Sequence, residues 1–600
     1  MLYLTIFGNS LYNNSMENKV KKKKIGVMSF YKQYALLIFF SVSFLAGQAI
    51  CELQLPEYMS NIVSQGIAVS DMDKVLYWGL WMIGLTLLAS IFSVVVSYLS
   101  SKISAGIARD LRKACFDKVM AFAGEEYNKF DLASLITRST NDVTQLQNFT
   151  NVLLRMIMMT PIMGMGGIIK AVKLGAGMGN LAWVIVIAVL IIFVAIALLL
   201  MIAQPKFMKM QKAIDDVNQV ANDELTGMMV IRAFNTQSKE QERFDVANRF
   251  LTGLSLFANR TMVSLMPLMT FVMNAVTIAI VWIAAYSAQD ITQVANMMAF
   301  VQYAIHIIMS FMLVSMVFVL IPRASVSAKR INEILHTSVS IINKEDKQNP
   351  QGLRLVGDVE FRDVAYSYGG DNAVEHISFV AEHGKTTAII GSTGSGKSTI
   401  INMIPRLIDA TEGEILIDSV NVKDYNLKDL RANVGFVPQK NYLFSGTIAS
   451  NVGYGSTEDT DVLNKSIDIA QARHFVDNKE NGLESEIAQG GGNVSGGQKQ
   501  RLAIARALSK NAPIYVFDDS FSALDFKTDK ALRAALAQEL SRATIIIVAQ
   551  RVGTIKNADQ IIVLDDGRIV GKGKHEELLK NCDVYREIAK SQLSEEELGI

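Results

Sequence analysis

Cysteine is scarce in this sequence, which has only three among 600 residues. Cys51, Cys115 and Cys582 are odd in number and far apart, so neither a disulfide framework nor a zinc-ligand spacing is present, and we expect packing roles for all three. An excess of one charge is also missing, because 58 basic side chains balance 57 acidic ones to a net charge of +1. This balance gives no sign of a basic nucleic-acid-binding surface, and we expect no nucleic-acid partner.

Apolar residues, by contrast, make up 50% of the chain and concentrate in its first half. This distribution predicts a membrane part followed by a soluble part. Crossing a bilayer takes roughly 20 apolar residues. Six stretches come near that length: Ala35–Met59, Val75–Leu99, Leu153–Ile169, Leu181–Ile202, Met262–Ala285 and Val294–Leu320.

The gaps between these spans are alternately short and long, and they differ in charge. The long gaps, 100–152 and 203–261, hold 15 Lys and Arg residues, whereas the short gaps hold three. Because basic residues favour the cytoplasmic side, we expect a multi-pass protein of the cell membrane whose long gaps and both termini are cytoplasmic. Residues 1–26 are expected to form a basic cytoplasmic tail. The long gaps keep a helical rhythm, so we expect the membrane helices to continue into the cytosol.

A few polar side chains fall inside the predicted spans, where they are energetically costly. They either line a cargo cavity or form hydrogen bonds between helices, and the sequence leaves both interpretations open. For Arg155, near a helix end, we favour the structural interpretation. The others are Gln48, Glu52, Gln54, Asn274, Gln302 and His306. The 28 methionines are expected mainly to fill the core, although their side chains also suit varied ligands.

After the last span, a polar stretch with Pro350 gives way to short β-like runs. We therefore place a transmembrane domain at 27–335, a linker at 336–352 and a nucleotide-binding domain at 353–600. In the last of these, a strand predicted at 386–390 leads through a glycine-rich turn into a helix predicted at 400–407. Such a turn is a P-loop, whose backbone N–H groups point at phosphate oxygens. Its residues are Gly391, Ser392, Thr393, Gly394, Ser395, Gly396, Lys397 and Ser398, followed by Thr399.

Three further positions around this loop predict nucleotide chemistry. Lys397 is expected to reach the β- and γ-phosphates, and the Ser398 hydroxyl to hold Mg²⁺. A second buried strand, predicted at 514–518, ends in Asp518, a carboxylate placed to hold Mg²⁺ through water. The next residue, Asp519, stands where the attacking water would be polarised.

A second phosphate-binding element lies between these two strands. Its glycines precede a helix and expose N–H groups to anions. The element consists of Ser495, Gly496, Gly497 and Gln498. One domain with two phosphate-binding edges suggests face-to-face dimerisation.

With these motifs the chain resembles an ATP-binding cassette (ABC) transporter of the exporter type, from about Tyr31 to Ala589. The second phosphate element matches the family's signature and Ser522–Asp525 its D-loop. Gln439 matches the Q-loop, and Tyr368 stands where the family stacks an aromatic ring on adenine. The resemblance implies a type IV exporter-like domain of six transmembrane helices, followed by an α/β P-loop NTPase domain with an ABC helical subdomain.

The resemblance also implies how such a chain works. Two subunits enclose two ATP molecules with Mg²⁺, each between the P-loop of one subunit and the signature and D-loop Asp525 of the other. Gln439 adds a ligand to Mg²⁺ beside Ser398 and Asp518. Closure on ATP drives export of cargo, and hydrolysis resets the transporter.

The sequence departs from the family pattern at two positions, because Asp519 and Gln550 stand where a glutamate and a histidine are expected. Aspartate is one methylene shorter, which withdraws the carboxylate by about 1.5 Å. A misplacement of about 1 Å can cost about 100-fold in rate. Gln550 can hydrogen-bond a γ-phosphate but cannot exchange a proton as imidazole does. With Gln439 these residues form the catalytic positions of a site that we predict to hydrolyse ATP weakly.

The signature and the D-loop stay intact, so the chain keeps what it contributes to a second ATP site. This asymmetry predicts one half of a heterodimeric exporter of drugs or lipid-like amphiphiles, whose partner half-transporter carries the glutamate and the histidine. The alternative is a homodimeric exporter of lipid or peptide that hydrolyses ATP slowly with Asp519 as base. A soluble ABC protein acting on ribosomes or DNA is disfavoured by the six spans. Membrane lipid and a hydrophobic or amphipathic cargo are the other expected partners.

Overall fold

The computed structural model describes residues 26–175, 181–287, 290–343, 355–456 and 459–593. The contacts among these residues divide them into two units. One unit contains the described residues of Met1–Met120 and Leu132–Thr337, and the other contains those of Ala121–Asp131 and Ser338–Ile600. The expected tail at 1–26 lies outside the described residues except for Gly26.

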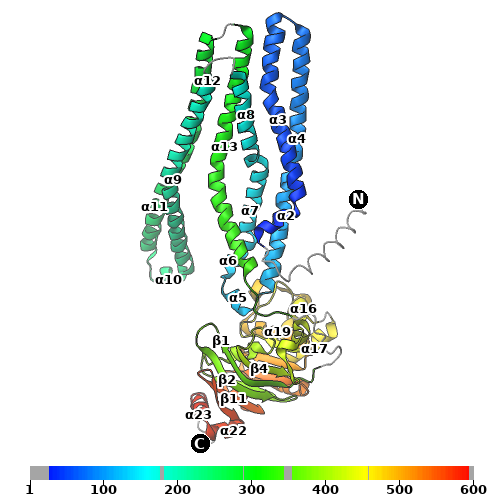
Figure 1. The fold of residues 1–600 in the computed structure, drawn as a ribbon. Coiled ribbons are helices and arrows are strands. Elements are labelled where there is room, and N and C mark those ends of the chain that lie inside the picture. Colours follow the sequence, from blue (N-terminus) through cyan, green and yellow to red (C-terminus); the bar gives the residue numbers. More distant parts are fainter. Residues whose placement is uncertain (1–25, 176–180, 288–289, 344–354, 457–458, 594–600) are drawn as a thin grey trace, which may run out of the picture. The chain divides into compact units, whose positions relative to one another are not determined.

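The first unit consists of helices that run side by side (Figure 1). Helices α4, α9 and α13 have 49, 46 and 46 residues. At 1.5 Å per residue each is about 70 Å long, more than twice the hydrocarbon thickness of a bilayer, as expected for membrane helices that continue into the cytosol. The α-helices are α2 (Val27–Gln33), α3 (Ala35–Asn61), α4 (Met72–Met120), α6 (Leu132–Ser139), α7 (Asn141–Val152), α8 (Met159–Gly175), α9 (Leu181–Thr226), α10 (Met228–Ala233), α11 (Gln237–Val263), α12 (Leu265–Ser287) and α13 (Ile291–His336). Two short π-helical segments, η1 (Ile62–Gly66) and η3 (Leu153–Ile157), and a 3₁₀ turn, η2 (Ile67–Val69), lie between them.

The described residues contain five helical stretches that are long and apolar enough to cross a membrane: Ala35–Val69, Met72–Met120, Leu132–Leu174, Gln237–Tyr286 and Ile291–Leu313. A shorter apolar stretch, Trp183–Leu199, lies within the fourth predicted span. Each of the six predicted spans therefore overlaps an apolar helical stretch, and among the described residues five of these stretches are long enough to cross a membrane.

Glycines bring three of these helices close together. A Cβ on Gly166 of α8 would lie 2.3 Å from Leu53 Cδ1 of α3, and a Cβ on Gly167 would lie 2.9 Å from Ile307 Cγ1 of α13. Small residues of this kind let membrane helices approach each other. The Tyr303 hydroxyl of α13 donates to the Leu53 carbonyl at 3.0 Å, which joins α13 to α3 in the same packed core.

The second unit is built on a six-stranded sheet with the order β12-β11-β3-β10-β9-β6. All pairs are parallel except the antiparallel pair of β12 with β11. Every residue of β9 and β10 is buried, as expected for parallel strands covered on both faces. The strands are β3 (Thr386–Gly391), β6 (Val434–Val437), β9 (Ile514–Asp518), β10 (Thr544–Val548), β11 (Gln560–Asp565) and β12 (Arg568–Gly573).

A four-stranded antiparallel sheet, β2-β1-β4-β5, and a two-stranded one, β7-β8, complete this unit. Their strands are β1 (Val359–Ser367), β2 (Asn372–Ala381), β4 (Glu412–Ile417), β5 (Val420–Asn421), β7 (Gly446–Thr447) and β8 (Glu486–Ile487). The helices are α5 (Gly124–Asn128), α14 (Lys397–Met403), α15 (Leu427–Ala432), α16 (Ile448–Val452), α17 (Thr460–Ile469), α18 (Arg473–Asp477), α19 (Gly496–Leu508), α20 (Phe526–Glu539), α21 (Val552–Ile555), α22 (His575–Asn581) and α23 (Asp583–Lys590). Single 3₁₀ turns lie at η4 (Val422–Asp424), η5 (Gly482–Glu484) and η6 (Gln489–Gly491).

The predicted fold class, a helical transmembrane domain followed by an α/β P-loop domain, is confirmed. The strand predicted at 514–518 has the observed bounds of β9. The helix predicted at 400–407 is wrong at both ends, because α14 begins at Lys397 and ends at Met403. Beyond it Arg406 adopts the left-handed conformation with φ of 52°. Its guanidinium binds the Asp409 carboxylate at 2.7 Å, which stabilises a turn where the apolar pattern suggests continued helix.

Candidate nucleotide-binding site

The carboxyl ends of neighbouring parallel strands bring the predicted site residues together. Strand β10 pairs with β3 on one side and with β9 on the other, and β6 pairs with β9. The P-loop follows β3, Asp519 follows β9, Gln550 follows β10 and Gln439 follows β6. Because the carboxyl ends of parallel strands meet at one edge, residues far apart in sequence converge there.

The P-loop is a tight turn that only glycine can form at its key positions. Gly394 and Gly396 have φ of 89° and 88°. A Cβ on Gly396 would lie 2.2 Å from Val374 Cγ1, so the loop also packs closely on β2. The Lys397 ammonium donates to the Gly391 carbonyl at 2.9 Å and to the Ser392 carbonyl at 2.5 Å. The loop therefore wraps around the cation that is expected to face the phosphates.

Tyr368 lies beside this loop, where an adenine-stacking ring is expected. Its hydroxyl is 3.3 Å from the Thr399 hydroxyl of α14, and its ring meets the Tyr366 ring edge-on at 4.8 Å between centroids. The residue is 62% exposed, which leaves one face of the ring open to a flat ligand.

Two of the three side chains expected to hold Mg²⁺, Ser398 and Asp518, meet in the structure, whereas Gln439 bonds Asp519. The Ser398 hydroxyl donates to Asp518 Oδ2 at 2.9 Å. Burial raises the pKa of the Asp518 carboxyl, while the hydrogen bond from Ser398 lowers it. Hydroxyl and carboxylate oxygens suit Mg²⁺, which usually keeps several waters and binds substrate phosphates. No group of three or more His, Cys, Asp or Glu residues gathers elsewhere in the described chain as a metal site.

The two residues that depart from the family pattern are bonded to each other. The Gln550 amide donates through Nε2 to Asp519 Oδ2 at 3.0 Å. Asp519 has φ of 47°, a left-handed conformation that aspartate tolerates better than most residues. Burial raises the pKa of the Asp519 carboxyl, and a hydrogen bond from the Gln439 side chain opposes this shift. Asp519, Gln550 and Gln439 therefore form one connected group.

The loop after β10 is held by a residue that the sequence analysis did not find. Gln592, just beyond α23, donates through Nε2 to the Gln550 carbonyl at 2.8 Å. Its Oε1 accepts from the Val552 N–H at 2.8 Å. One amide thus bridges both sides of the loop that carries Gln550. A lone glutamine 42 residues along the chain gives no sequence pattern that could reveal this contact.

Replacing Gln592 with alanine is expected to loosen this loop. Each hydrogen bond contributes about 0.5–1.5 kcal/mol net, so amide exchange at Val552 should become about 2 to 12 times faster. Hydrogen exchange followed by mass spectrometry on the full-length chain measures the change. Gln592→Glu is the matched control, because it keeps an acceptor for Val552 N–H and should protect this amide more than alanine does. Equal exchange in wild type and Gln592→Ala would contradict the clamp.

The second phosphate-binding element begins helix α19 in the expected way. The Ser495 hydroxyl accepts from Gln498 N–H at 3.3 Å, and Gln498 Oε1 accepts from Ser495 N–H at 3.0 Å, which forms a capping box. Ser495 and Gly496 are exposed. A Cβ on Gly497 would lie 3.2 Å from the Ala523 carbonyl, so the element packs closely on the D-loop.

A buried glutamine, also missed by the sequence analysis, joins this element to the strand end. Gln500 is 4% exposed, donates to the Asp519 carbonyl at 3.3 Å and accepts from Ala523 N–H at 3.3 Å. Its place on the apolar face of α19 could have revealed it, because a buried polar group needs partners. Gln500 thus couples the backbone of Asp519 to the D-loop.

Asp525 of the D-loop is the N-cap of α20. Its carboxylate accepts from Thr528 N–H at 2.9 Å, and this backbone hydrogen bond lowers the pKa of Asp525. The next residue, Phe526, is 80% exposed. Together with exposed Ser495 and Gly496, the D-loop leaves polar and apolar groups on the surface of this unit.

The segment Ala121–Asp131 packs within the same unit. Glu126 accepts from Ala123 N–H at 2.8 Å and from Ser340 N–H at 3.0 Å. The Tyr366 hydroxyl of β1 donates to Glu125 at 2.8 Å. The short helix α5 is therefore fixed by hydrogen bonds to residues far along the chain.

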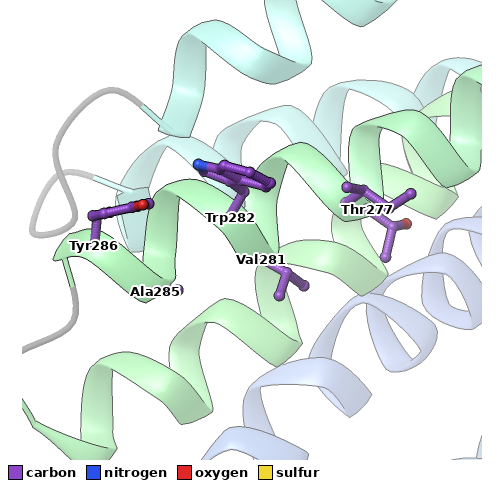
Figure 2. A pocket seen from close by; sticks show the side chains of 6 residues that line it. Thr277, Val281, Trp282, Ala285 and Tyr286 are labelled. Carbon is purple, nitrogen blue, oxygen red and sulfur yellow. The ribbon is translucent and has the colours of Figure 1, made fainter.

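A separate hollow lies along α12 in the helical unit (Figure 2). The Trp282 and Tyr286 rings are 6.4 Å apart and are 65% and 83% exposed. Exposed aromatic rings at the end of an apolar helix are typical of a membrane–water interface. The lining residues are Thr277, Ile278, Val281, Trp282, Ala285 and Tyr286.

Comparisons with known proteins identify both units. Residues 38–311 match the family model of the ABC transporter transmembrane region, and residues 374–522 match that of the ABC transporter. The chain is 39% identical over 550 residues to an ABC transporter ATP-binding protein of Mycobacterium tuberculosis, covering 90% of this chain and 94% of that protein. It is 30% identical over 512 residues to the ATP-dependent lipid A-core flippase of Pseudomonas aeruginosa, covering 84% and 83%.

The fold is that of a solved bacterial transporter. The structure of an Atm1-family ABC exporter with ATP bound superposes with a TM-score of 0.73 at 22% identity, covering 94% of this chain and 99% of that one. The overall fold of the chain is therefore that of a known ABC exporter structure.

Proposed function

The chain belongs to the ABC transporter family as a half-transporter, and from this premise we propose that it is one subunit of a heterodimeric exporter. It is a membrane protein whose ATPase domain binds ATP and drives transport. In this proposal its own ATP site mainly holds nucleotide, while its signature completes the catalytic site of a different half-transporter.

The observation that carries the proposal is the hydrogen bond between Gln550 and Asp519. A general base must reach the attacking water, and here the shortened carboxylate accepts from the residue at the switch position. The amide of Gln550 has no group that can take up a proton at neutral pH. Both departures thus favour slow proton transfer at this site.

The other parts of the site support tight nucleotide binding. In this proposal Lys397 would neutralise the β- and γ-phosphates, and Ser398 and Asp518 would hold Mg²⁺. Mg²⁺ supplies charge neutralisation on the phosphate oxygens when it is bound. Tyr368 would stack on the base. Binding without turnover is the expected outcome of these groups next to Asp519 and Gln550.

The residues exposed on the surface of the chain favour a contact with a second polypeptide. Ser495, Gly496 and Asp525 lie on the surface with intact capping geometry. Near α10, four large apolar side chains are exposed outside the predicted spans, and such groups usually mark contact surfaces. They are Leu225 at 72%, Met229 at 79%, Val230 at 60% and Phe234 at 77%.

One observation favours the alternative of a slow homodimer. Burial raises the pKa of Asp519, and a carboxylate with a raised pKa is a better proton acceptor. In that case the purified chain alone would hydrolyse ATP in its own site, and Asp519→Asn would abolish the activity.

We assign the protein to the cytoplasmic membrane with both termini in the cytosol, because the long gaps carry the basic residues. The exposed aromatic pair on α12 would contact lipid at one interface. For the cargo we propose a hydrophobic or amphipathic molecule, since a relative at 30% identity is named a lipid A-core flippase.

Copurification tests the subunit assignment. The tagged full-length chain, isolated from its native membrane, is expected to bring down a second half-transporter that carries glutamate and histidine at the positions of Asp519 and Gln550. ATPase activity should require both polypeptides. Brisk ATP hydrolysis and transport by this chain alone would refute the heterodimer.

A further inference from the structure

Acidic and basic side chains are rare within the six predicted spans, which contain only Glu52, Glu57, Arg155 and His306 of this kind. Such groups inside a membrane usually face a cavity or pair with one another. Each therefore needs a partner or a function.

Glu57 has its partner. Its Oε2 lies 2.5 Å from the Lys170 ammonium of α8, which also donates to Gln54 Oε1 at 3.1 Å. The close approach of α8 to α3 at Gly166 makes this ion pair possible. Glu57 and Lys170 neutralise each other and join the two helices, which is a structural role. Arg155 is exposed in η3, near a helix end.

Glu52 is different, because within the described residues it forms no ion pair with Lys or Arg. Its Oε1 accepts from Gln48 Nε2 at 2.9 Å, one helical turn earlier on α3. His306 of α13 lies near this carboxylate, because the Tyr303 hydroxyl, three residues earlier on α13, donates to the Leu53 carbonyl of α3 at 3.0 Å. The Glu52 carboxylate acts electrostatically on the imidazole. A neutral amide does not balance the charge of a carboxylate, so this position is suited to a bound cation.

The depth of Glu52 follows from ring contacts between α3 and α4. Phe44 pairs with Phe92 at 5.7 Å between centroids, and Tyr58 pairs with Trp78 at 5.2 Å. Interpolation between these two ring pairs places Glu52 of α3 level with residue 84 of α4. That residue is about 14 Å along the helix from the start of the span at Val75, close to the middle of a bilayer core of about 30 Å.

The facing side of α13 suits an amphiphile. Gln302, His306 and Met309 follow one another at helical spacing and share one face. Gln302 is exposed and Met309 is 44% exposed. A polar amide and a flexible thioether on the same face of α13 as His306 offer contacts to a charged head and to an apolar body.

We propose that Glu52, with Gln48 and His306, forms a cargo subsite that binds the cationic head of an amphiphilic molecule. This inference rests on the proposed export function and narrows its cargo to a chemical class. A cation neutralises the carboxylate at mid-membrane, whereas an anionic head is repelled. His306, when neutral, adds a hydrogen-bond partner without competing for the negative charge.

The test measures equilibrium binding of tetraphenylphosphonium, which carries a fixed positive charge, to the full-length chain copurified with its partner subunit in nanodiscs. Glu52→Gln keeps the size and the Gln48 contact and is expected to weaken binding about 30-fold or more, the usual result of removing one partner of a desolvated charge pair. Glu52→Asp should retain most of the affinity. Arg155→Gln, outside the subsite, should leave it unchanged.

A neutral amphiphile of similar size, tetraphenylmethane bearing one hydroxyl, serves as the second probe. Its affinity should be the same in wild type and Glu52→Gln. Equal losses for both probes, with a lower melting temperature, would assign Glu52 to structure and overturn the subsite. Wild-type protein that binds the neutral probe but not tetraphenylphosphonium would also overturn the subsite. A separate measurement tests the export function. If that function is wrong, wild-type vesicles will accumulate no probe when ATP is added.

Discussion

Replacing Ser495 with alanine is expected to lower ATP turnover of the assembled heterodimer by about 100-fold or more. In the proposed arrangement the Ser495 hydroxyl stabilises the γ-phosphate bound by the partner subunit, and loss of one such donor typically costs 10²- to 10³-fold in rate. The hydroxyl accepts from Gln498 N–H in the capping box, so its proton stays available to donate to phosphate. Steady-state hydrolysis by the purified pair measures the effect.

Two matched variants make this result specific. Ser495→Thr keeps both the hydroxyl and the cap and should retain most of the turnover.

Lys397→Ala should remove photoaffinity labelling of this chain by an ATP analogue, while turnover at the partner's site continues at a substantial rate. Normal hydrolysis in Ser495→Ala would contradict the role in trans. Complete loss in Lys397→Ala would contradict a site that mainly holds nucleotide.

The sequence predicts the motif residues well because each motif is local. The P-loop needs glycine where φ is positive, and Gly394 and Gly396 have this conformation. The buried strand at 514–518 is apolar throughout up to Asp518, and β9 has the same bounds. Parallel pairing of four strands then brings their ends together without further information from the sequence.

Contacts between distant segments escaped prediction for a physical reason. The Gln592 side chain bonds the backbone groups of Gln550 and Val552. Because every residue carries such groups, no residue type in the loop marks this contact. The interaction of Gln550 with Asp519 depends on the left-handed turn after β9, which hydrophobic patterning does not record. The sequence predicts that short segments of the long gaps meet the soluble domain, but not the contacts that hold Ala121–Asp131 in the second unit, where Glu126 accepts from Ser340 N–H and Glu125 accepts from the Tyr366 hydroxyl.

Restoring the family residues is expected to turn the holding site into a hydrolysing one. Asp519→Glu moves the carboxylate forward by about 1.5 Å, and positional errors of about 1 Å can cost about 100-fold, so hydrolysis in this pocket should rise by about that factor. Gln550→His adds a group that can exchange a proton, and the double variant should be fastest. Gln550→His alone should gain less, because the short carboxylate remains.

The measurement isolates this pocket by combining each variant with a partner subunit whose catalytic glutamate is replaced by glutamine. Single-turnover hydrolysis of ATP then reports mainly the pocket that contains Asp519. Asp519→Asn is the matched control, and it should leave the slow wild-type rate nearly unchanged if Asp519 is not an effective base. Glutamate tolerates the φ of 47° less well than aspartate, so Asp519→Glu is also expected to lower the melting temperature slightly. A wild-type rate equal to that of the double variant, abolished by Asp519→Asn, would instead establish Asp519 as a working base and favour the homodimer.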